Sequence, residues 1–266
     1  MPEPSAPRIL AITNQKGGVG KTTTAINLGA ALAELGERVL IIDLDPQGNA
    51  STGLGISARD RENTTYELLH EEAPLSAVIR RTGVERLDIA PGTTDLSSTD
   101  VELGSHENRI FLLKDALGGD ALAAYGYILI DCPPSLSLLT VNALVACDAV
   151  LVPLQAEFFA LEGLSQLMLT VRDVRETANP NLRIEGVVLT MFDQRNNLSQ
   201  QVEEDARATL GELVLTTRIP RNVRLSEAPS YALPVLAYDP ASKGSLAYRD
   251  LAEEILARHA KRKEPA

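Results

Sequence analysis

Short apolar runs recur along the chain and alternate with longer stretches of mixed polarity. The runs that we interpret as strands are residues 8–13, 38–43, 87–91, 127–131, 149–154, 184–192 and 215–220. The first, second, fourth and fifth are almost continuously apolar, as expected for strands that are covered on both faces. Strand–helix–strand repetition favours parallel pairing. We therefore expect an α/β fold: a doubly wound, mostly parallel sheet with helices on both faces.

The stretch between the first two strands, residues 21–36, places apolar residues at helical spacing and ends on Gly36, a residue suited to a helix C-terminus. We find no low-complexity linker and no long internal repeat, so residues 1–266 are expected to form one domain. Its ends, residues 1–7 and about 258–266, are expected to be loosely structured.

Composition is ordinary for a soluble globular protein, with 44% hydrophobic and 23% charged residues. The two cysteines, Cys132 and Cys147, form no CxxC pair, which argues against a disulfide framework or a zinc site and suits a reducing compartment. The first residues lack the apolar core of a signal peptide, and no apolar run is long enough to span a membrane. A cytoplasmic protein is expected.

The formal net charge of −11 at first opposes nucleic-acid binding, but the charge is unevenly distributed. Residues 1–182 hold 13 Lys/Arg and 24 Asp/Glu, whereas residues 183–266 hold 12 of each. All of the acidic excess therefore lies in the first two-thirds of the chain. A local basic surface near the C-terminus remains possible.

Residues 14–24 read NQKGGVGKTTT and stand between the first predicted strand and the first predicted helix. A strand, a glycine-rich turn and a helix that opens on Lys-Thr form the context of a phosphate-binding loop. Glycines let backbone N–H groups face a phosphate without Cβ clashes, and the helix N-terminus adds partial positive charge. The alternative, a tight turn without a ligand, does not need this sequence. The residues expected to bind the phosphates of a nucleotide here are Gly17, Gly18, Val19, Gly20, Lys21, Thr22 and Thr23.

Within this loop, Lys21 is expected to reach the β- and γ-phosphates, the Thr22 hydroxyl to ligate Mg²⁺, and Thr23 to donate to the α-phosphate. The usual pattern begins with a glycine five residues before the Gly-Lys pair, where this chain has Gln15. A second lysine, Lys16, follows it. One lysine suffices to neutralise a bound phosphate, so Lys16 calls for another explanation.

KGGVGKTT resembles the deviant Walker A loop of one group of P-loop ATPases. The resemblance implies that two subunits sandwich two ATP molecules, with Lys16 and Gly17 at the dimer interface. Lys16 would then contact the phosphates held by the partner, as an arginine finger does in trans. The alternative is a solvated surface lysine. Lys16, Lys21 and Asp45 are the expected catalytic residues.

Two further apolar strands end on carboxylates, in IIDLDPQGN and YILIDCPPS. Carboxyl ends of parallel strands meet at one edge of a sheet, where ligands bind. Asp45 resembles the second aspartate of the family's A′ box, which orients or activates the attacking water; a loop cap is the alternative. Asp43 is expected in the Mg²⁺ shell or in a structural role. Asp131 is expected to hold Mg²⁺, through a water.

Later loops narrow the resemblance. TMFDQRNN and IPRNVRLSEAPS, with the trailing YDP and the earlier DLDPQGNAS and DCPPS, resemble the ParA/Soj chromosome- and plasmid-partitioning ATPases over about residues 8–256. The resemblance implies adenine contacts from Met191, Pro220 and Asn222. It also implies an ATP-bound homodimer on nucleoid DNA, a slow intrinsic ATPase, and a ParB-type centromere-binding protein that stimulates hydrolysis.

Four arginines in the last third could contact DNA: Arg195, Arg218, Arg221 and Arg224. Non-specific DNA binding is phosphate neutralisation, so a few arginines on a dimer face suffice. The alternative is that they pair with Glu227, Asp193 or the nucleotide.

Three other functions stay open. A MinD-like membrane-cycling ATPase needs a C-terminal amphipathic anchor, whereas the chain ends LAEEILARHAKRKEPA. An iron–sulfur electron donor that shares the loop needs two cluster-bridging cysteines. A module that holds ATP without turnover would make no use of Asp45. Residues 55–86 suggest a loop and a helix, with no chemistry that we can name.

Overall fold

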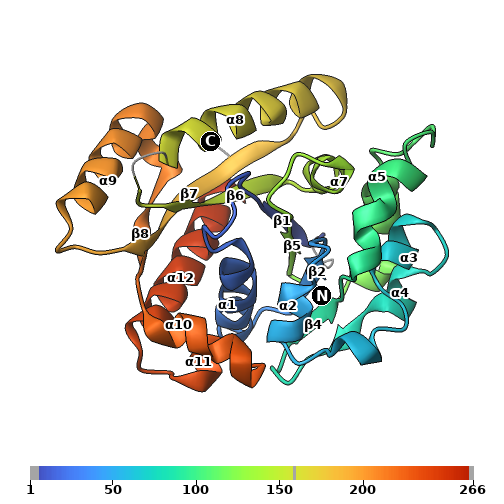
Figure 1. The fold of residues 1–266 in the computed structure, drawn as a ribbon, viewed down its shortest axis with the longest axis horizontal. Helices are drawn as coiled ribbons and strands as arrows, with labels where there is room; N and C mark the ends of the chain where they lie inside the picture. Colours follow the sequence, from blue (N-terminus) through green and yellow to red (C-terminus); the bar gives the residue numbers. More distant parts are fainter. Residues whose placement is uncertain (1–5, 158–159, 264–266) are drawn as a thin grey trace.

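In a computed structural model that describes residues 6–157 and 160–263, the chain forms an eight-stranded sheet (Figure 1). The strand order is β3-β4-β2-β5-β1-β6-β7-β8, and all pairs except the antiparallel β3–β4 are parallel. The strands are β1 (Arg8–Ile12), β2 (Val39–Asp43), β3 (Arg80–Arg81), β4 (Leu87–Ala90), β5 (Tyr127–Asp131), β6 (Ala149–Gln155), β7 (Arg183–Phe192) and β8 (Val214–Pro220).

The seven predicted strands are confirmed, each within one residue at either end. The helices are α1 (Lys21–Glu34), α2 (Asn49–Gly53), α3 (Thr65–Leu69), α4 (Leu75–Val78), α5 (Thr99–Glu102), α6 (Leu112–Ala116), α7 (Leu138–Ala146), α8 (Ala160–Thr177), α9 (Asn197–Leu210), α10 (Val223–Glu227), α11 (Val235–Tyr238) and α12 (Lys243–Lys263). Among the described residues, no helix is both long and apolar enough to cross a membrane.

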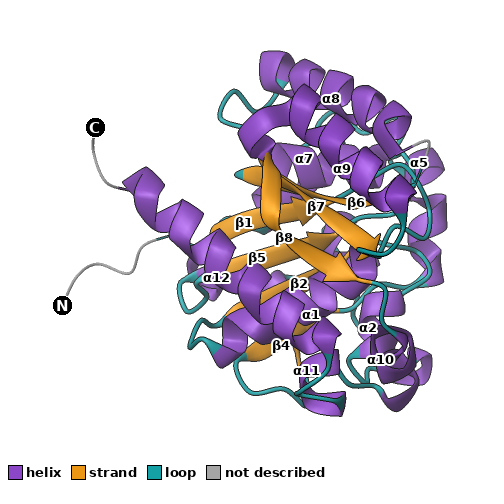
Figure 2. Ribbon diagram, turned by 90° about the vertical axis from the view of Figure 1, so that its left-hand side faces the viewer, coloured by secondary structure: helices purple, strands orange, loops and turns teal. Residues whose placement is uncertain are grey.

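Helices cover both faces of the sheet, as predicted, with α7 and α8 on one face and α1 and α12 on the other (Figure 2). Alternate residues of the strands divide between two apolar clusters. Leu40 and Ile42 of β2 pack with α7 and α8, whereas Val39 and Ile41 pack with α1 and α12. Because both faces are buried, the strands are continuously apolar rather than alternating.

The central strand β1 lies between β5 and β6, and β2 lies on the far side of β5. In the register, Asp131 at the end of β5 is the neighbour both of Ile12 in β1 and of Asp43 in β2. The three strands therefore end side by side. This arrangement brings the glycine-rich loop and both predicted carboxylates to one edge of the sheet.

Two parts of the fold differ from the sequence-based expectation. The region 55–86 includes the two-residue strand β3, too short to produce a hydrophobic pattern. The loosely structured end expected from about residue 258 is wrong for residues 258–263, which continue α12 as a helix. Arg258 donates to the carbonyls of Glu185 and Glu212, and this holds the helix against the sheet. Residues 1–5 and 264–266 lie outside the described residues.

Candidate nucleotide site

The loop after β1 is shaped for an anion. Gly18 and Gly20 adopt left-handed conformations, with φ of 73° and 90°, which favour glycine. Gly20 is the N-cap of α1, and no side chain caps this helix end. The first N–H groups of α1 therefore remain available to a phosphate. Among the loop residues, Val19 is buried and its carbonyl accepts a hydrogen bond from Thr190 Oγ1 at 2.8 Å.

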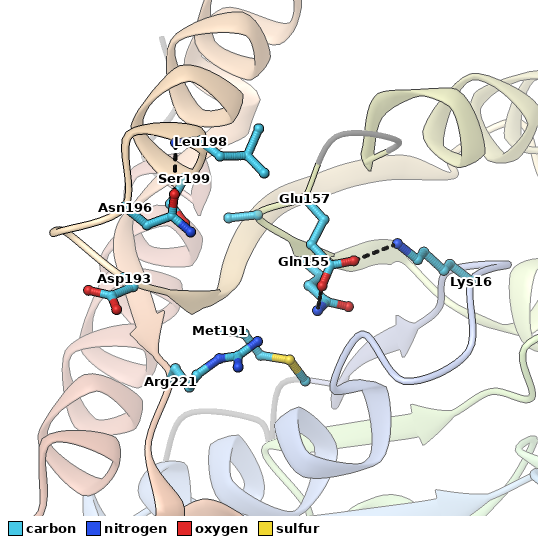
Figure 3. A pocket seen from close by; sticks show the side chains of 10 residues that line it. Lys16, Gln155, Glu157, Met191, Asp193, Asn196, Leu198, Ser199 and Arg221 are labelled. Carbon is cyan, nitrogen blue, oxygen red and sulfur yellow. Dashed lines mark hydrogen bonds and ion pairs between the residues drawn. The ribbon is translucent and has the colours of Figure 1, made fainter.

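The two lysines of the loop point in different directions. Lys21 Nζ donates to the carbonyl of Lys16 at 3.1 Å, so its ammonium group turns back across the loop. Lys16 Nζ instead reaches Glu157 Oε2, just beyond β6, at 3.2 Å (Figure 3). The backbone of Lys16 is fixed by Asn14, whose side chain accepts from Lys16 N–H and donates to the carbonyl of Pro153 in β6. One lysine thus serves the loop itself and the other faces outward.

Lys21 is buried, and desolvation lowers the pKa of its ammonium group. Asp131, and more weakly Asp45, oppose this shift because a nearby negative charge favours the charged lysine. The negatively charged phosphates of a bound nucleotide would also raise the pKa of Lys21.

Asp131 is fully buried, and neither carboxylate oxygen accepts a hydrogen bond of normal geometry from a described residue. Burial, and then the charge of Asp43, raise the pKa of Asp131 well above its usual range, while Thr22 and Lys21 lower it. Buried carboxylates are normally paired. Two unsatisfied oxygens beside the Thr22 hydroxyl fit Mg²⁺, which prefers oxygen ligands.

Both carboxylate oxygens of Asp43, by contrast, accept hydrogen bonds from the protein. Its Oδ2 accepts from Ser51 N–H at 2.9 Å and from Ser51 Oγ at 2.6 Å, and its Oδ1 accepts from Asp45 N–H at 3.2 Å. Burial raises the pKa of Asp43 to about 6, against the lowering effect of the Ser51 hydrogen bonds. Of the two roles expected for Asp43, these contacts favour the structural one.

Asp45 starts the loop that leaves β2. Its Oδ1 accepts from Gln47 N–H at 2.9 Å, and its carbonyl accepts from Gly48 N–H at 2.8 Å. The side chain is only 8% exposed. Gly92, after β4, packs against this segment so closely that a Cβ there would lie 2.8 Å from the carbonyl oxygen of Asp43. The aspartate predicted to act on water therefore stands on a fixed turn.

The three residues predicted to contact adenine line one pocket of about 510 Å³ together with the phosphate-binding loop. Gly20 and Thr23 line this pocket from the start of α1, and Met191, Pro220 and Asn222 line it from the segments that follow or end β7 and β8. Met191 adopts an uncommon left-handed conformation, with φ of 51°, at the end of β7. The Asn222 side chain accepts from Arg224 N–H at 2.8 Å and caps α10.

Among the described residues, two of the four predicted DNA-binding arginines, Arg195 and Arg221, have no ion pair with a buried carboxylate. The Arg195 side chain is 91% exposed and contacts Asp193 at 3.2 Å. Arg221 is exposed and lines both the pocket of about 510 Å³ and a second one that also includes Met191, Lys16 and Glu157 (Figure 3).

The other two arginines, Arg218 and Arg224, pair with carboxylates, which is the alternative to DNA contact. Arg218 bonds to the buried Glu203 at 2.7 Å. Arg224 pairs with Glu227 at 2.8 Å and with Asp239 at 3.1 Å.

Both cysteines lie in the core. Cys132 and Cys147 are 0% and 2% exposed, and burial raises the pKa of each thiol, that of Cys147 to about 12. Such thiols are inert and cannot bridge a cluster between subunits. This removes the support for an iron–sulfur donor.

Sequence reasoning missed Asn14, Glu157 and Arg61, all of which contact the loops of the site. Asn14 lies inside the quoted loop motif and could have been noticed there. Glu157 carries no local signal because its partner Lys16 is 141 residues away, and the Arg61 contact that joins two strand ends is with Gly92, 31 residues away.

Comparison with known proteins agrees with this geometry. A family model described as an AAA domain matches residues 7–184. The chromosome partitioning protein ParA of Caulobacter vibrioides is 57% identical over 262 residues, covering 97% of both chains. The sporulation initiation inhibitor protein Soj of Bacillus subtilis is 53% identical, covering 94% of this chain and 98% of its own.

Among solved structures, one from Mycobacterium smegmatis described as cobyrinic acid a,c-diamide synthase contains an ATP analogue and magnesium. It superposes with a TM-score of 0.82 at 38% identity and covers 97% of both chains.

Proposed function

The chain belongs to the ParA/Soj family of chromosome-partitioning ATPases, and we propose that its ATP cycle switches a homodimer on and off DNA. The protein is a Mg²⁺-dependent ATPase, with ATP and Mg²⁺ as its ligands. Dimerisation, DNA binding and the partner are the parts proposed here.

The residues proposed to hold the nucleotide are those of the loop after β1. Lys21 and the N–H groups of Gly17, Gly18, Val19 and Gly20 bind the β- and γ-phosphates, and Thr23 binds the α-phosphate. Asp131 and Thr22 hold Mg²⁺, which supplies charge neutralisation at the phosphates. The pocket beside Met191, Pro220 and Asn222 takes the base.

Asp45 orients the attacking water. Its turn is fixed by bonds to Gln47 and Gly48, and it faces the same end of the sheet as Asp131. A carboxylate held in place can accept a hydrogen bond from water and align it for attack on the γ-phosphate.

The observation that carries the dimer proposal is the direction of Lys16. Its ammonium group extends away from the loop's own glycines toward Glu157, whereas Lys21 folds over the loop. A single loop therefore presents one cation to its own nucleotide and one outward. Each Lys16 reaches the phosphates held by the partner, so the dimer forms only when ATP is bound.

DNA is bound by the exposed Arg195 and Arg221, through phosphates and without base reading. Arg218 and Arg224 support this surface less directly, because each is engaged by carboxylates. Hydrolysis, stimulated by a ParB-type centromere-binding protein, separates the dimer and releases the DNA.

The membrane-cycling alternative lacks a comparable observation. The apolar residues of α12, among them Tyr248, Leu251 and Ile255, are buried against α1 and the sheet. That face is therefore unavailable as an amphipathic anchor.

The test is co-sedimentation with DNA in ATP, ADP or no nucleotide at two salt concentrations. Wild type is expected to need ATP and to weaken with salt, and Lys16→Ala and Arg195→Glu are expected to lose binding. Arg86→Glu is the matched control, because Arg86 precedes β4 at the opposite edge of the sheet and is also exposed. DNA binding that is absent or indifferent to nucleotide overturns the proposal, and liposome binding is then the next measurement.

A further inference from the structure

Arg61 lies in the region for which the sequence indicated no chemistry, just after a 3₁₀ turn at Ala58–Asp60. Its guanidinium group makes five hydrogen bonds to main-chain carbonyls and a hydroxyl. Nη1 donates to Gly92 O at 2.8 Å, Nε to Ile56 O at 3.2 Å, and Nη2 to Ile56 O at 2.9 Å, Thr52 Oγ1 at 2.8 Å and Gly48 O at 3.2 Å.

These acceptors belong to three separate segments: the turn after β2, the end of α2, and the residues after β4. Only a planar group with five donors can serve them together. Gly48 has φ of 60°, and a Cβ at this position would overlap the Arg61 guanidinium. The backbone of the turn therefore lies directly against the arginine.

Two of the three segments contact Asp45. Gly48 N–H donates to the Asp45 carbonyl at 2.8 Å, which closes the turn from its far end. On the other side, a Cβ at Gly92 would lie 3.1 Å from the Asp45 carbonyl oxygen. Arg61 bonds to Gly48 and to Gly92, so it holds the two backbone segments between which Asp45 stands.

Hydrogen bonds from a charged donor are stronger than neutral ones, and losing this donor removes the side-chain partner of the part-buried Gly92 and Ile56 carbonyls. The opening of the turn moves Asp45 without touching the phosphate loop. None of the Arg61 bonds involves residues 14–24.

We propose that Arg61 is a positioning residue for Asp45: it fixes the turn after β2 so that the carboxylate meets the attacking water. The inference rests on the proposed role of Asp45. Arg61 acts through the backbone of this turn and, among the described residues, makes no hydrogen bond to the phosphate-binding loop. Its loss therefore lowers kcat and leaves nucleotide affinity unchanged.

The experiment compares full-length wild type, Arg61→Ala, Arg61→Lys, Asp45→Ala and the control Arg59→Ala, an exposed arginine two residues away. ATP affinity, kcat and KM are measured in Mg²⁺, together with thermal melting. For Arg61→Ala we expect kcat to fall about tenfold to hundredfold with KM within about twofold, because small displacements of an oriented group cost rates of this order. Arg61→Lys keeps the positive charge but loses the planar group with five donors, so its kcat should also be low.

Free guanidinium chloride at millimolar concentration should restore part of the activity of Arg61→Ala, and should not accelerate Asp45→Ala, Arg59→Ala or wild type. A purely structural arginine would lower the melting temperature without a kcat–KM split or rescue.

The outcomes separate the two proposals. If Asp45→Ala is inactive while folded Arg61→Ala and Arg61→Lys keep wild-type kcat, the positioning role is wrong and the role of Asp45 stands. If Asp45→Ala keeps wild-type kcat, both roles are wrong. If Arg61→Ala does not fold, unimpaired kcat in Arg61→Lys overturns the positioning role.

Discussion

Lys16 Nζ lies 3.2 Å from Glu157 Oε2, and this ion pair joins the phosphate-binding loop to the end of β6 within one subunit. Both side chains are partly exposed, at 39% and 46%. Such a pair contributes no more than about 1 kcal/mol. Under the proposed function Lys16 must leave Glu157 to reach a partner's phosphates, so the pair opposes dimerisation by a small amount.

Glu157→Gln should therefore strengthen the ATP-bound dimer, lowering its dissociation constant by at most about twenty-five-fold, since two such pairs of about 1 kcal/mol are broken per dimer and 1.4 kcal/mol corresponds to tenfold. Light scattering against protein concentration in ATP measures this. The control is Glu176→Gln, which removes a similar exposed pair with Arg172 on α8. A weaker dimer in Glu157→Gln would show instead that Glu157 acts across the interface.

The two lysines should have separable effects. Lys21→Ala removes the cation that covers the loop and should weaken ATP binding about tenfold to hundredfold, the value of a hydrogen bond to a charged group. Lys16→Ala should bind ATP nearly as wild type does but fail to dimerise. Titration calorimetry in Mg²⁺ and light scattering give both quantities. Equal loss of ATP affinity in the two variants would contradict the division of roles.

The nucleotide-free protein should lose stability as pH rises through the range set by Asp43. The folded pKa of this buried carboxyl is about 6, above the usual value of 3.8, because burial disfavours its charge. The unfolded chain therefore releases its proton first, and the contribution is present below pH 4 and lost as pH rises through about 6. Its upper size is about 3 kcal/mol.

Urea unfolding at several pH values tests this, with Asp43→Asn as the non-titrating reference. Relative to Asp43→Asn, wild type should become less stable from pH 4 to pH 6. If the stability of wild type and of Asp43→Asn changes with pH in the same way, the pH dependence does not come from Asp43.

Arg218 and Arg195 should behave differently on substitution. Arg218→Ala breaks a bond to Glu203, which is about 90% buried and also holds Arg207, and should cost about 1 kcal/mol of stability. Its DNA affinity should change little. Arg195→Glu should weaken DNA binding and reduce its salt dependence with unchanged stability. A large loss of DNA affinity in Arg218→Ala at unchanged stability would reverse these roles.

Much of the site could be predicted because parallel strands end at one edge. Asp43 and Asp131 each follow an apolar run, and these runs alone predicted that the two side chains lie close together. The strand register confirms that they are neighbours. The phosphate-binding loop was predicted from its glycines, and two of them, Gly18 and Gly20, adopt left-handed conformations that favour glycine.

The missed contacts have a different origin. Glu157 meets Lys16 across 141 residues, and Arg61 meets Gly92 across 31. Such contacts depend on loop conformations that no period in the sequence encodes. Arg218 also could not be assigned from its neighbours, because its partner Glu203 lies on another element, α9.

The pocket proposed for the base has a consequence for how the protein folds. Gly20 and Thr23 share it with Pro220 and Asn222, and Thr24 bonds to Tyr248 in the last helix. The proposed nucleotide site is therefore complete only when residues 220–222 have folded against the phosphate loop. Contacts between such distant segments form slowly. A chain truncated before Pro220 would leave the phosphate loop without Pro220 and the later residues that line this pocket, and could not be stabilised by ATP there.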